Sequence, residues 1–426
     1  MTPVAQQHST NKSRFYSPMV NGESFKHRFA AAASAGCLLV AGMLAVATPA
    51  QAQDTITFGA SLSLTGGQST EGRLVREGYD FYVKHINEKG GIKVGDKTYK
   101  VAIKYYDDQS NANTSVQLYE KLINEDKVNL LLGPYSSGTT FAASAVSEKY
   151  QIPMVAAHSA SPAIFERGFK YIFATLTPLA EYTSNSIKMA QTAGVKRVAL
   201  ISENALFPKS SGEAAAAQAK AAGMEVVYNE IYPTGTKDFS AMLQAMKSKN
   251  PEFLLFAGYT GDATVVARQI SEVGVPLKMF GVSLGPTLPG FIDTLGPKAE
   301  GILEPIQWAP NMPYKDEIFG WTAPQFAEMF QKEAGHVPDY HPPQSAAALE
   351  VYQRALEKAG TLDPKKVRDE IAKTDIMTMY GPIRFNEKGQ NIAKGMSVVQ
   401  VQNGKPLVVY PVEGSTGKFI YPMPPR

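Results

Sequence analysis

The sequence predicts an α/β protein made of two doubly wound parallel-sheet lobes. Short runs of apolar or alternating residues, which predict strands, take turns with runs whose apolar residues recur at three- and four-residue steps, which predict helices. One such series begins near Ile56 and a second begins at Arg197. Alternation of this kind, with a period of about thirty residues, indicates βαβ units with right-handed crossovers.

The first series contains five expected strands. They are expected at 56–64, 101–106, 128–132, 152–156 and 171–175. Helices are expected at 74–86, 116–122, 140–150 and 180–192. The run 128–132 is apolar throughout, which is typical of a parallel strand covered on both faces.

The second series repeats the pattern and then changes. Strands are expected at 198–202, 224–231, 252–257 and 277–282, with helices at 212–222, 239–247 and 263–273. Residues 305–343 hold seven prolines and little periodicity, which favours a connection between lobes. Helices resume at 345–358 and 367–373. Two apolar runs around Asn403-Gly404 then predict a terminal hairpin.

The first 52 residues have the three parts of a secretory signal peptide. A basic flank at Lys26–Arg28 precedes an uncharged apolar stretch, and Ala50-Gln51-Ala52 has the small residues of a signal-peptidase cleavage site. A membrane anchor and a lipoprotein modified at Cys37 are the alternatives. Pro49 ends the apolar run before it reaches the length of a strongly hydrophobic membrane span, which disfavours the anchor. The run continues past Cys37 and does not end before it, which disfavours the lipoprotein. The start codon is Met1 or Met19. We therefore expect export to the periplasm.

Composition excludes several classes of protein once the leader is set aside. The chain has 426 residues, 42 Lys+Arg, 39 Asp+Glu and one Cys. Residues 1–52 hold four of the basic residues, one of the acidic residues and the cysteine, so the remaining 374 residues are neutral and cysteine-free. We therefore expect no disulfide scaffold, no Cys-based zinc site and no basic surface for binding nucleic acid. Neither a metal nor a cofactor is expected.

A Gly- and Ser-rich loop between an expected strand and an expected helix is the most informative stretch. It runs from Gly133 through Tyr135, Ser136 and Ser137 to Thr140. Thr139 stands where a P-loop requires Lys, which disfavours a phosphate site. Free N–H groups at a helix start and neighbouring hydroxyls suit a carboxylate. The alternative is a plain helix cap.

A similar loop follows the next expected strand and contains Ser159, Ala160 and Ser161. Ligands of open α/β sheets bind beyond the carboxyl ends of strands, so the two loops favour a shared site. His158 lies in this second loop, and we interpret it as a structural histidine because no carboxylate neighbour can be identified.

Gly281-Val282-Ser283-Leu284-Gly285 matches the G-x-S-x-G pattern of serine hydrolases. Asp316 or Asp339, followed by His336 or His341, would complete a triad in order. Two prolines follow the serine closely, at Pro286 and Pro289, and disfavour the packed helix that the pattern needs. The hydrolase remains an alternative function.

Taken in order, several short segments resemble the periplasmic solute-binding proteins of ABC importers, of the leucine/isoleucine/valine-binding type. The resemblance covers nearly all of the chain after the leader. The segments that carry it are Gly59–Gly66, Ile86–Ile92, Tyr106–Asp108, Gly133–Thr140, Lys237–Phe239, Gly258-Tyr259 and Gly381–Phe385.

The resemblance implies the type I periplasmic binding fold, in which two lobes joined by a three-crossing hinge close on a small solute. Lobe 1 is expected to comprise 53–175 and 308–382, and lobe 2 to comprise 176–307 and 383–426. A binding protein, not an enzyme, is expected. The partners would be a membrane permease and a carboxylate or amino acid, and the protein would be a monomer. A ligand-binding sensor of the same fold is a further alternative.

Carried over by position, the resemblance gives ten expected ligand-binding residues. They are Glu71, Tyr135, Ser136, Ser137, Ser159, Ala160, Ser161, Phe207, Tyr259 and Ser283. Amino-acid binders of this type have an acidic residue after the Phe-Gly strand end, where this chain has Ser283. Burying an ammonium group without a carboxylate is costly. Either Glu71 substitutes, or the ligand is an aromatic or other organic acid, which we favour.

Overall fold

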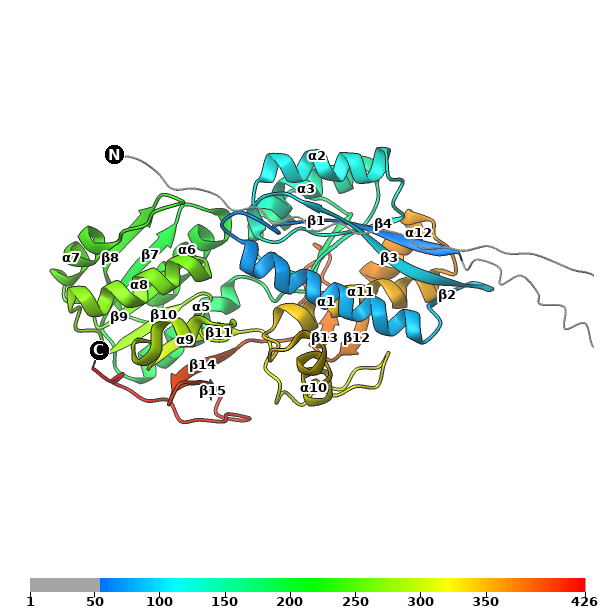
Figure 1. The fold of residues 1–426 in the computed structure, drawn as a ribbon. Helices are drawn as coiled ribbons and strands as arrows, with labels where there is room; N and C mark the ends of the chain where they lie inside the picture. Colours follow the sequence, from blue (N-terminus) through cyan, green and yellow to red (C-terminus); the bar gives the residue numbers. More distant parts are fainter. Residues whose placement is uncertain (1–53, 426) are drawn as a thin grey trace, which may run out of the picture. The chain divides into compact units, whose positions relative to one another are not determined.

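The computed structural model describes residues 54–425, and they form an α/β fold with two large sheets (Figure 1). The predicted signal peptide at 1–52, including Cys37, lies outside the described residues. Within the part that is described, no helix is both long enough and apolar enough to span a bilayer.

The first sheet is doubly wound. Its strands are β1 Thr55–Leu62, β2 Ile92–Val94, β3 Lys97–Asp107, β4 Leu130–Leu132, β5 Met154–Ala156 and β6 Ile172–Ala174. They lie in the order β2-β3-β1-β4-β5-β6, and only the β2–β3 pair is antiparallel. The chain starts in the middle of the sheet at β1, adds β3 on one side and then adds β4, β5 and β6 on the other. The strand order therefore reverses beside β1.

Helices cover both faces of this sheet. One face packs against α1 Ser69–Glu88, α10 Ala323–Ala334, α11 His341–Ala359 and α12 Pro364–Ala372, and the other against α2 Ala112–Asn124, α3 Ser137–Tyr150 and α4 Pro162–Phe165 (Figure 1). Burial on both faces explains why β4 is apolar at every position.

The second sheet repeats this plan. Its strands are β7 Arg197–Glu203, β8 Glu225–Tyr232, β9 Phe253–Ala257, β10 Met279–Val282, β11 Ile302–Ile306, β14 Ser397–Gln402 and β15 Lys405–Tyr410. The order is β15-β14-β11-β10-β9-β7-β8, and the five strands from β8 to β11 are parallel. Here the order reverses beside β7. The predicted fold class is therefore confirmed in both sheets.

The faces of the second sheet carry separate clusters of apolar side chains. One cluster joins the sheet to α7 Ser240–Lys247, α8 Thr260–Val273 and α9 Phe291–Leu295, and the other joins it to α5 Ala180–Thr192 and α6 Leu206–Ala221. The predicted terminal hairpin is confirmed as the antiparallel pair β14–β15. Asn403 and Gly404 both have positive φ, at 52° and 72°, as a tight two-residue turn requires.

The chain passes between the two sheets three times. It leaves the first sheet after β6, leaves the second after β11, and returns to the second at β14, after the small hairpin of β12 Asp375–Thr378 and β13 Gly381–Arg384. The predicted lobe boundaries stay predictions. We propose a later third crossing than 382–383, because Phe385 packs on Phe173 and Gly389 O accepts a hydrogen bond from Ala174 N in β6.

The three connections meet around Lys394, whose side chain is buried. Its Nζ donates to Gln307 O at 2.6 Å and to Tyr380 O at 2.8 Å, and it lies 3.5 Å from the centre of the Tyr380 ring. Thr177, in the first connection, donates to Gln307 Oε1. Burial lowers the pKa of Lys394 well below its ordinary value.

Several helices differ from the sequence prediction: the short α4 and α9 were not predicted, α1 begins at Ser69 and not at 74, and α10 and α6 differ as follows. Residues 305–343 contain α10, so the prediction of an irregular connection was wrong in part. Thr322 and Gln325 form a capping box at its start, and Pro324 lies in its first turn, where a missing N–H does no harm. Helix α6 begins at Leu206, earlier than the predicted 212, again with a proline near its start.

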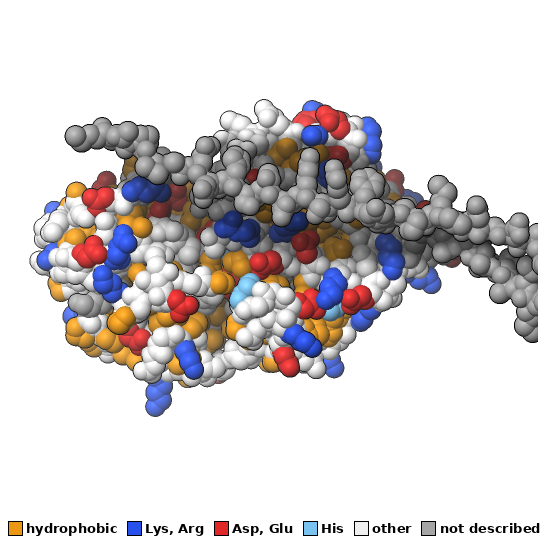
Figure 2. All heavy atoms as spheres, viewed as in Figure 1, with side chains coloured by type: hydrophobic (Ala, Val, Ile, Leu, Met, Phe, Trp, Pro, Cys, Tyr) orange, Lys and Arg blue, Asp and Glu red, His pale blue; other side chains and the backbone are white. Residues whose placement is uncertain are grey.

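The face of the molecule seen in Figure 2 carries basic and acidic side chains interspersed. This mixture matches the equal numbers of basic and acidic residues that remain once residues 1–52 are excluded.

Candidate functional site

The candidate site lies where the strand order reverses in each sheet. After β1 and β4 come Glu71, in the first turn of α1, and Tyr135–Ser137, at the start of α3. After β7 and β9 come Phe207, in the first turn of α6, and Tyr259, just before α8. Loops at such switch points leave a crevice at the carboxyl ends of the strands. Both doubly wound sheets therefore direct these predicted residues to the region where an open α/β sheet binds its ligand.

Tight packing fixes the loop that follows β4. A Cβ at Gly133 would lie 2.7 Å from Ala156 Cα, so only glycine lets β4 and β5 end this close together. Ser136 caps α3 with φ at 74°, and its Oγ lies 2.6 Å from Thr139 Oγ1. The same Oγ accepts a hydrogen bond from Thr139 N, and the start of α3 carries the partial positive charge of a helix N-terminus.

Ser137 ties this loop to the one that follows β5. Its Oγ accepts hydrogen bonds from Ala160 N and Ser161 N, both at 3.1 Å. Two of the N–H groups expected to hold a ligand carboxylate are thus occupied by Ser137. The Ser137 hydroxyl proton stays available as a donor, because both of these bonds use Oγ as the acceptor.

A small cavity, partly open to solvent and here called the inner cavity, lies between these loops and the second sheet; it holds about 20 Å3 for the centres of water-sized molecules. Its lining comprises Tyr135, Ser136, Ser137, His158, Ala160, Leu176, Tyr182, Phe207, Tyr259, Leu284 and Tyr340. Six of the ten expected ligand-binding residues are in this set: Tyr135, Ser136, Ser137, Ala160, Phe207 and Tyr259. Their role as ligand contacts stays a prediction.

Aromatic rings form much of the cavity wall. The ring centre of Tyr259 lies 6.3 Å from that of Tyr135 and 6.5 Å from that of Phe207, and Phe207 meets Tyr182 edge-on at 5.3 Å. Burial raises the pKa of Tyr135 and of Tyr259 well above the ordinary value. Their hydroxyls therefore remain protonated donors at neutral pH, and the rings offer flat apolar surfaces.

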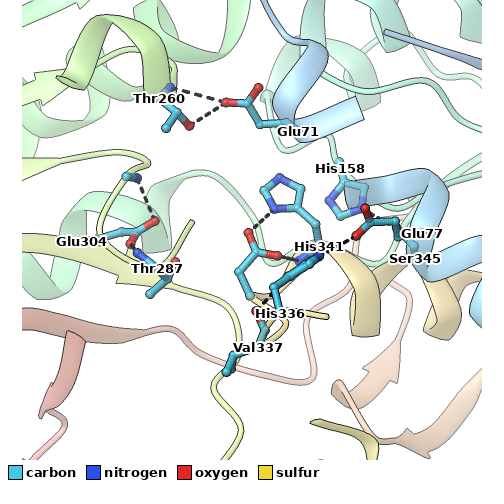
Figure 3. A network of polar contacts seen from close by, with 12 residues as sticks. Glu71, Glu77, His158, Thr260, Thr287, Glu304, His336, Val337, His341 and Ser345 are labelled. Atoms are coloured by element: carbon cyan, nitrogen blue, oxygen red, sulfur yellow. Dashed lines mark hydrogen bonds and ion pairs between the residues drawn. The ribbon is translucent and has the colours of Figure 1, made fainter. Parts of the chain in front are cut away.

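The remaining four expected residues lie outside this lining. Glu71 is 1% exposed, and its Oε1 accepts hydrogen bonds from Thr260 Oγ1 at 2.6 Å and Thr260 N at 3.4 Å (Figure 3). Ser161 Oγ contacts Ser210 Oγ at 3.1 Å. Ser159 and Ser283 are buried beside the cavity, where the neighbouring Leu284 takes the lining position. Glu71 therefore joins the two lobes.

A loop beside the cavity is held by a buried carboxyl group. Glu304 in β11 accepts from Gly285 N at 3.2 Å and from Thr287 N at 2.8 Å, which fixes the segment that follows Leu284 (Figure 3). Burial raises the pKa of Glu304 to about 8, against the lowering effect of these hydrogen bonds. At neutral pH this group is therefore mostly protonated.

Sequence reasoning missed His158 as a cavity residue. The structure places it in the lining, 5% exposed, with Nε2 2.9 Å from Ser345 Oγ (Figure 3). Its position two residues after β5, in a hydroxyl-rich loop, was the available signal. Burial lowers the pKa of His158 well below its ordinary value, and the neighbouring His341 lowers it further. His158 is therefore neutral at neutral pH.

An Asp–His pair is present near the G-x-S-x-G segment. His341 Nδ1 lies 2.7 Å from Asp339 Oδ2, as a triad would require. The other ring nitrogen, Nε2, is buried without a hydrogen-bond partner in the described chain, so it does not contact the Ser283 hydroxyl. The three residues thus do not form the hydrogen-bonded relay of a serine hydrolase.

The inner cavity offers hydroxyls, amides and one imidazole, but no side-chain charge. Among the residues that the structure describes as lining it, none is Asp, Glu, Lys or Arg. Elsewhere in residues 54–425, no group of three or more potential side-chain ligands is placed to hold a metal ion. The arrangement suits an anion held by neutral donors at a helix start, with an apolar body against the rings.

The family model described as periplasmic binding protein matches residues 55–406. The chain belongs to the periplasmic binding protein family. A curated relative, the Leu/Ile/Val-binding protein homolog 7 of Brucella suis, is 26% identical over 392 residues, which cover 88% of this chain and 95% of the relative.

Solved structures of similar fold include proteins with two kinds of ligand. A leucine binding protein from Thermotoga maritima has a TM-score of 0.75 at 23% identity, covering 83% of this chain and 97% of its own. An ABC transporter solute binding protein from R. palustris in complex with benzoate has a TM-score of 0.73 at 16% identity, covering 87% and 98%. These likenesses concern the fold.

Proposed function

We propose that this protein is the periplasmic substrate-binding component of an ABC importer and binds a small carboxylate with an aromatic or apolar body. The ligand would lie in the inner cavity, between the lobes. The observation that carries this proposal is the cavity itself, which combines neutral donors at the start of α3 with walls of tyrosine and phenylalanine.

The carboxylate end of the ligand is expected at the start of α3. The Ser137 hydroxyl and the first N–H groups of the helix would donate to it, in the field of the helix dipole. Each such hydrogen bond to a charged group contributes about 1.5–3 kcal/mol. Tyr135, Phe207 and Tyr259 would pack on the body of the ligand.

An aromatic or other organic acid is favoured over an α-amino acid. An ammonium group in the inner cavity would meet no carboxylate, because Glu71 is outside the lining and is engaged by Thr260. A buried unpaired ammonium costs several kcal/mol. A solved structure of similar fold in complex with benzoate supports this choice of ligand class.

Closure of the lobes is the proposed binding step, with no chemistry on the ligand. Contacts such as Glu71–Thr260 join the lobes around the cavity, so they would form on closing. The closed form would then be recognised by a membrane permease, with the binding protein acting as a monomer. Export through the predicted signal peptide would leave Gln53 as the first residue, which N-terminal sequencing of the exported protein tests.

Calorimetry with benzoate, leucine and a neutral analogue such as benzamide tests the ligand class. We expect benzoate to bind, and to bind more tightly than leucine or benzamide. If leucine binds best, the ligand is an amino acid and the assignment to aromatic acids is wrong. If benzamide binds as tightly as benzoate, the carboxylate assignment is wrong. Thermal unfolding should report the same ranking, because only the folded state binds ligand.

A further inference from the structure

His158 is the part of the inner cavity that the proposed function leaves unused. Its imidazole packs against Tyr135, with ring centres 5.9 Å apart, and against His341, with ring centres 4.9 Å apart. His341 is itself held by Asp339. Tyr135 lies in the loop after β4 and His341 is the first residue of α11, and both contact the His158 ring at the cavity wall. Figure 3 shows His158 beside His341.

One nitrogen of His158 is satisfied and the other is not. Nε2 lies 2.9 Å from Ser345 Oγ, whereas Nδ1 is buried with no hydrogen-bond partner among the described residues. A buried polar atom left in this state destabilises the folded protein. His158 lines the inner cavity, so a group placed in the cavity is the candidate partner of Nδ1.

The chemistry of a neutral imidazole limits what those contents are. One ring nitrogen carries a proton and donates a hydrogen bond, and the other nitrogen accepts one. The Ser345 hydroxyl can either accept from Nε2 or donate to it. A hydroxyl on the ligand likewise donates to Nδ1 or accepts from it, so it fits both tautomers. The ligand carboxylate already has its donors at the start of α3, around Ser136 and Ser137, which leaves a second polar group to face His158.

We infer that His158 Nδ1 binds a ring hydroxyl of the ligand, which makes the site selective for hydroxylated aromatic carboxylates over unsubstituted ones. This inference rests on the proposed function. A ligand without the hydroxyl leaves Nδ1 unpaired in the closed cavity. The preference therefore comes from a lower affinity for the unsubstituted carboxylate. One neutral hydrogen bond, at about 1–1.5 kcal/mol, corresponds to a preference of up to about tenfold.

The test compares benzoate with its three monohydroxylated isomers in calorimetry, on the unmodified protein and on two variants. His158→Gln keeps a polar group near the position of Nε2 and loses the one at Nδ1. His158→Asn, with the shorter side chain, keeps a polar group near Nδ1 and loses the one at Nε2. The measured quantity is the ratio between the affinity for the best hydroxybenzoate and the affinity for benzoate.

We expect the unmodified protein to prefer one hydroxybenzoate isomer by about five- to tenfold. This ratio should fall to near one in His158→Gln and be largely retained in His158→Asn. Equal affinities for benzoate and every isomer in the unmodified protein would overturn the inference while leaving the proposed function in place. If both variants lose affinity for benzoate and hydroxybenzoate alike, His158 binds the carboxylate instead, and the inference is again wrong. If no aromatic carboxylate binds at all, the proposed ligand class fails first.

A second measurement needs no variant and so does not depend on how the variants fold. The chain after the predicted leader contains four histidines, so the imidazole 15N resonances of His158 can be assigned. The Nδ1 shift should move on adding the preferred hydroxybenzoate and move much less on adding benzoate. Identical shifts in the two complexes would show that the hydroxyl does not reach Nδ1.

Discussion

Glu71 Oε1 accepts a hydrogen bond of 2.6 Å from Thr260 Oγ1, and this bond joins α1 of the first lobe to α8 of the second. Glu71 is 1% exposed, so the contact is shielded from water. A bond of this kind favours the closed arrangement, because it is available only when the two helices are together.

Removing the Thr260 hydroxyl should therefore weaken ligand binding without touching the cavity wall. Thr260→Val is expected to cost about 1.5–3 kcal/mol of affinity, as for a hydrogen bond to a charged group, mainly through faster ligand dissociation. Stopped-flow displacement measures the rate. Thr264→Val is the matched control, since Thr264 Oγ1 bonds Thr260 O within the same helix. Equal effects of the two substitutions would contradict a role in closure.

Ser137→Ala should reduce both stability and affinity. Without Oγ, the buried N–H groups of Ala160 and Ser161 lose their acceptor, which should lower the free energy of unfolding by about 1–3 kcal/mol. Loss of the hydroxyl donor should weaken carboxylate binding by a similar amount. Urea unfolding and calorimetry measure the two effects.

The control for this substitution is Ser147→Ala at the far end of α3. Ser147 Oγ donates to Ile152 O and Tyr171 O, so its removal also destabilises the protein but lies away from the cavity. A loss of affinity in both variants would show that the Ser137 effect comes from stability alone.

Glu304 should make stability depend on pH. Its pKa rises from an unfolded value near 4.5 to about 8 in the folded protein, so between these values the folded state binds more protons. The free energy of unfolding contributed by this group is then complete at low pH and falls as pH rises to about 8, by at most about 1.4 kcal/mol per pH unit.

Glu304→Gln removes this titration, so the variant should gain stability relative to the unmodified protein as pH increases. Urea unfolding without ligand, at pH values from about 5 to about 8, gives the comparison. The opposite contribution of His158, whose pKa is lowered by burial, is common to both proteins and cancels. Parallel pH profiles would contradict the assignment.

Ser283→Ala tests the hydrolase alternative. Because His341 Nε2 does not contact the serine, we expect the purified protein to hydrolyse p-nitrophenyl esters only at a background rate that this substitution leaves unchanged. A loss of esterase activity in Ser283→Ala would establish an enzyme. The family and fold evidence instead concerns solute-binding proteins.

Much of the fold was predictable because periodic burial leaves a periodic sequence. The strand β4 is apolar at all its positions since both faces of its sheet are covered, and Asn403-Gly404 marks a turn that few other residues permit. Helix α10 was missed because prolines hide its pattern, although Thr322 and Gln325 gave a capping signal.

Without the family resemblance, the lining of the inner cavity was predictable only where the local sequence determines it. Ser136 and Ser137 follow a strand and start a helix, and both properties are visible in a short window. Glu71 and Thr260 are 189 positions apart, and His158 and Ser345 are 187 apart. Periodicity carries no information about such pairs, so neither the engagement of Glu71 by Thr260 nor the contact of His158 with Ser345 could be read from the sequence.

The enclosed amino group of Lys394 limits the ways in which the lobes can separate. Pulling it away from Gln307 O and Tyr380 O would leave a donor and two carbonyls unpaired in a dry interior, whereas turning about it keeps both bonds. The hinge thus favours one rotational degree of freedom over sliding or twisting. Substituting Lys394 with a side chain that cannot donate would leave the ligand contacts in place, and the open state would become a broad set of orientations in place of one.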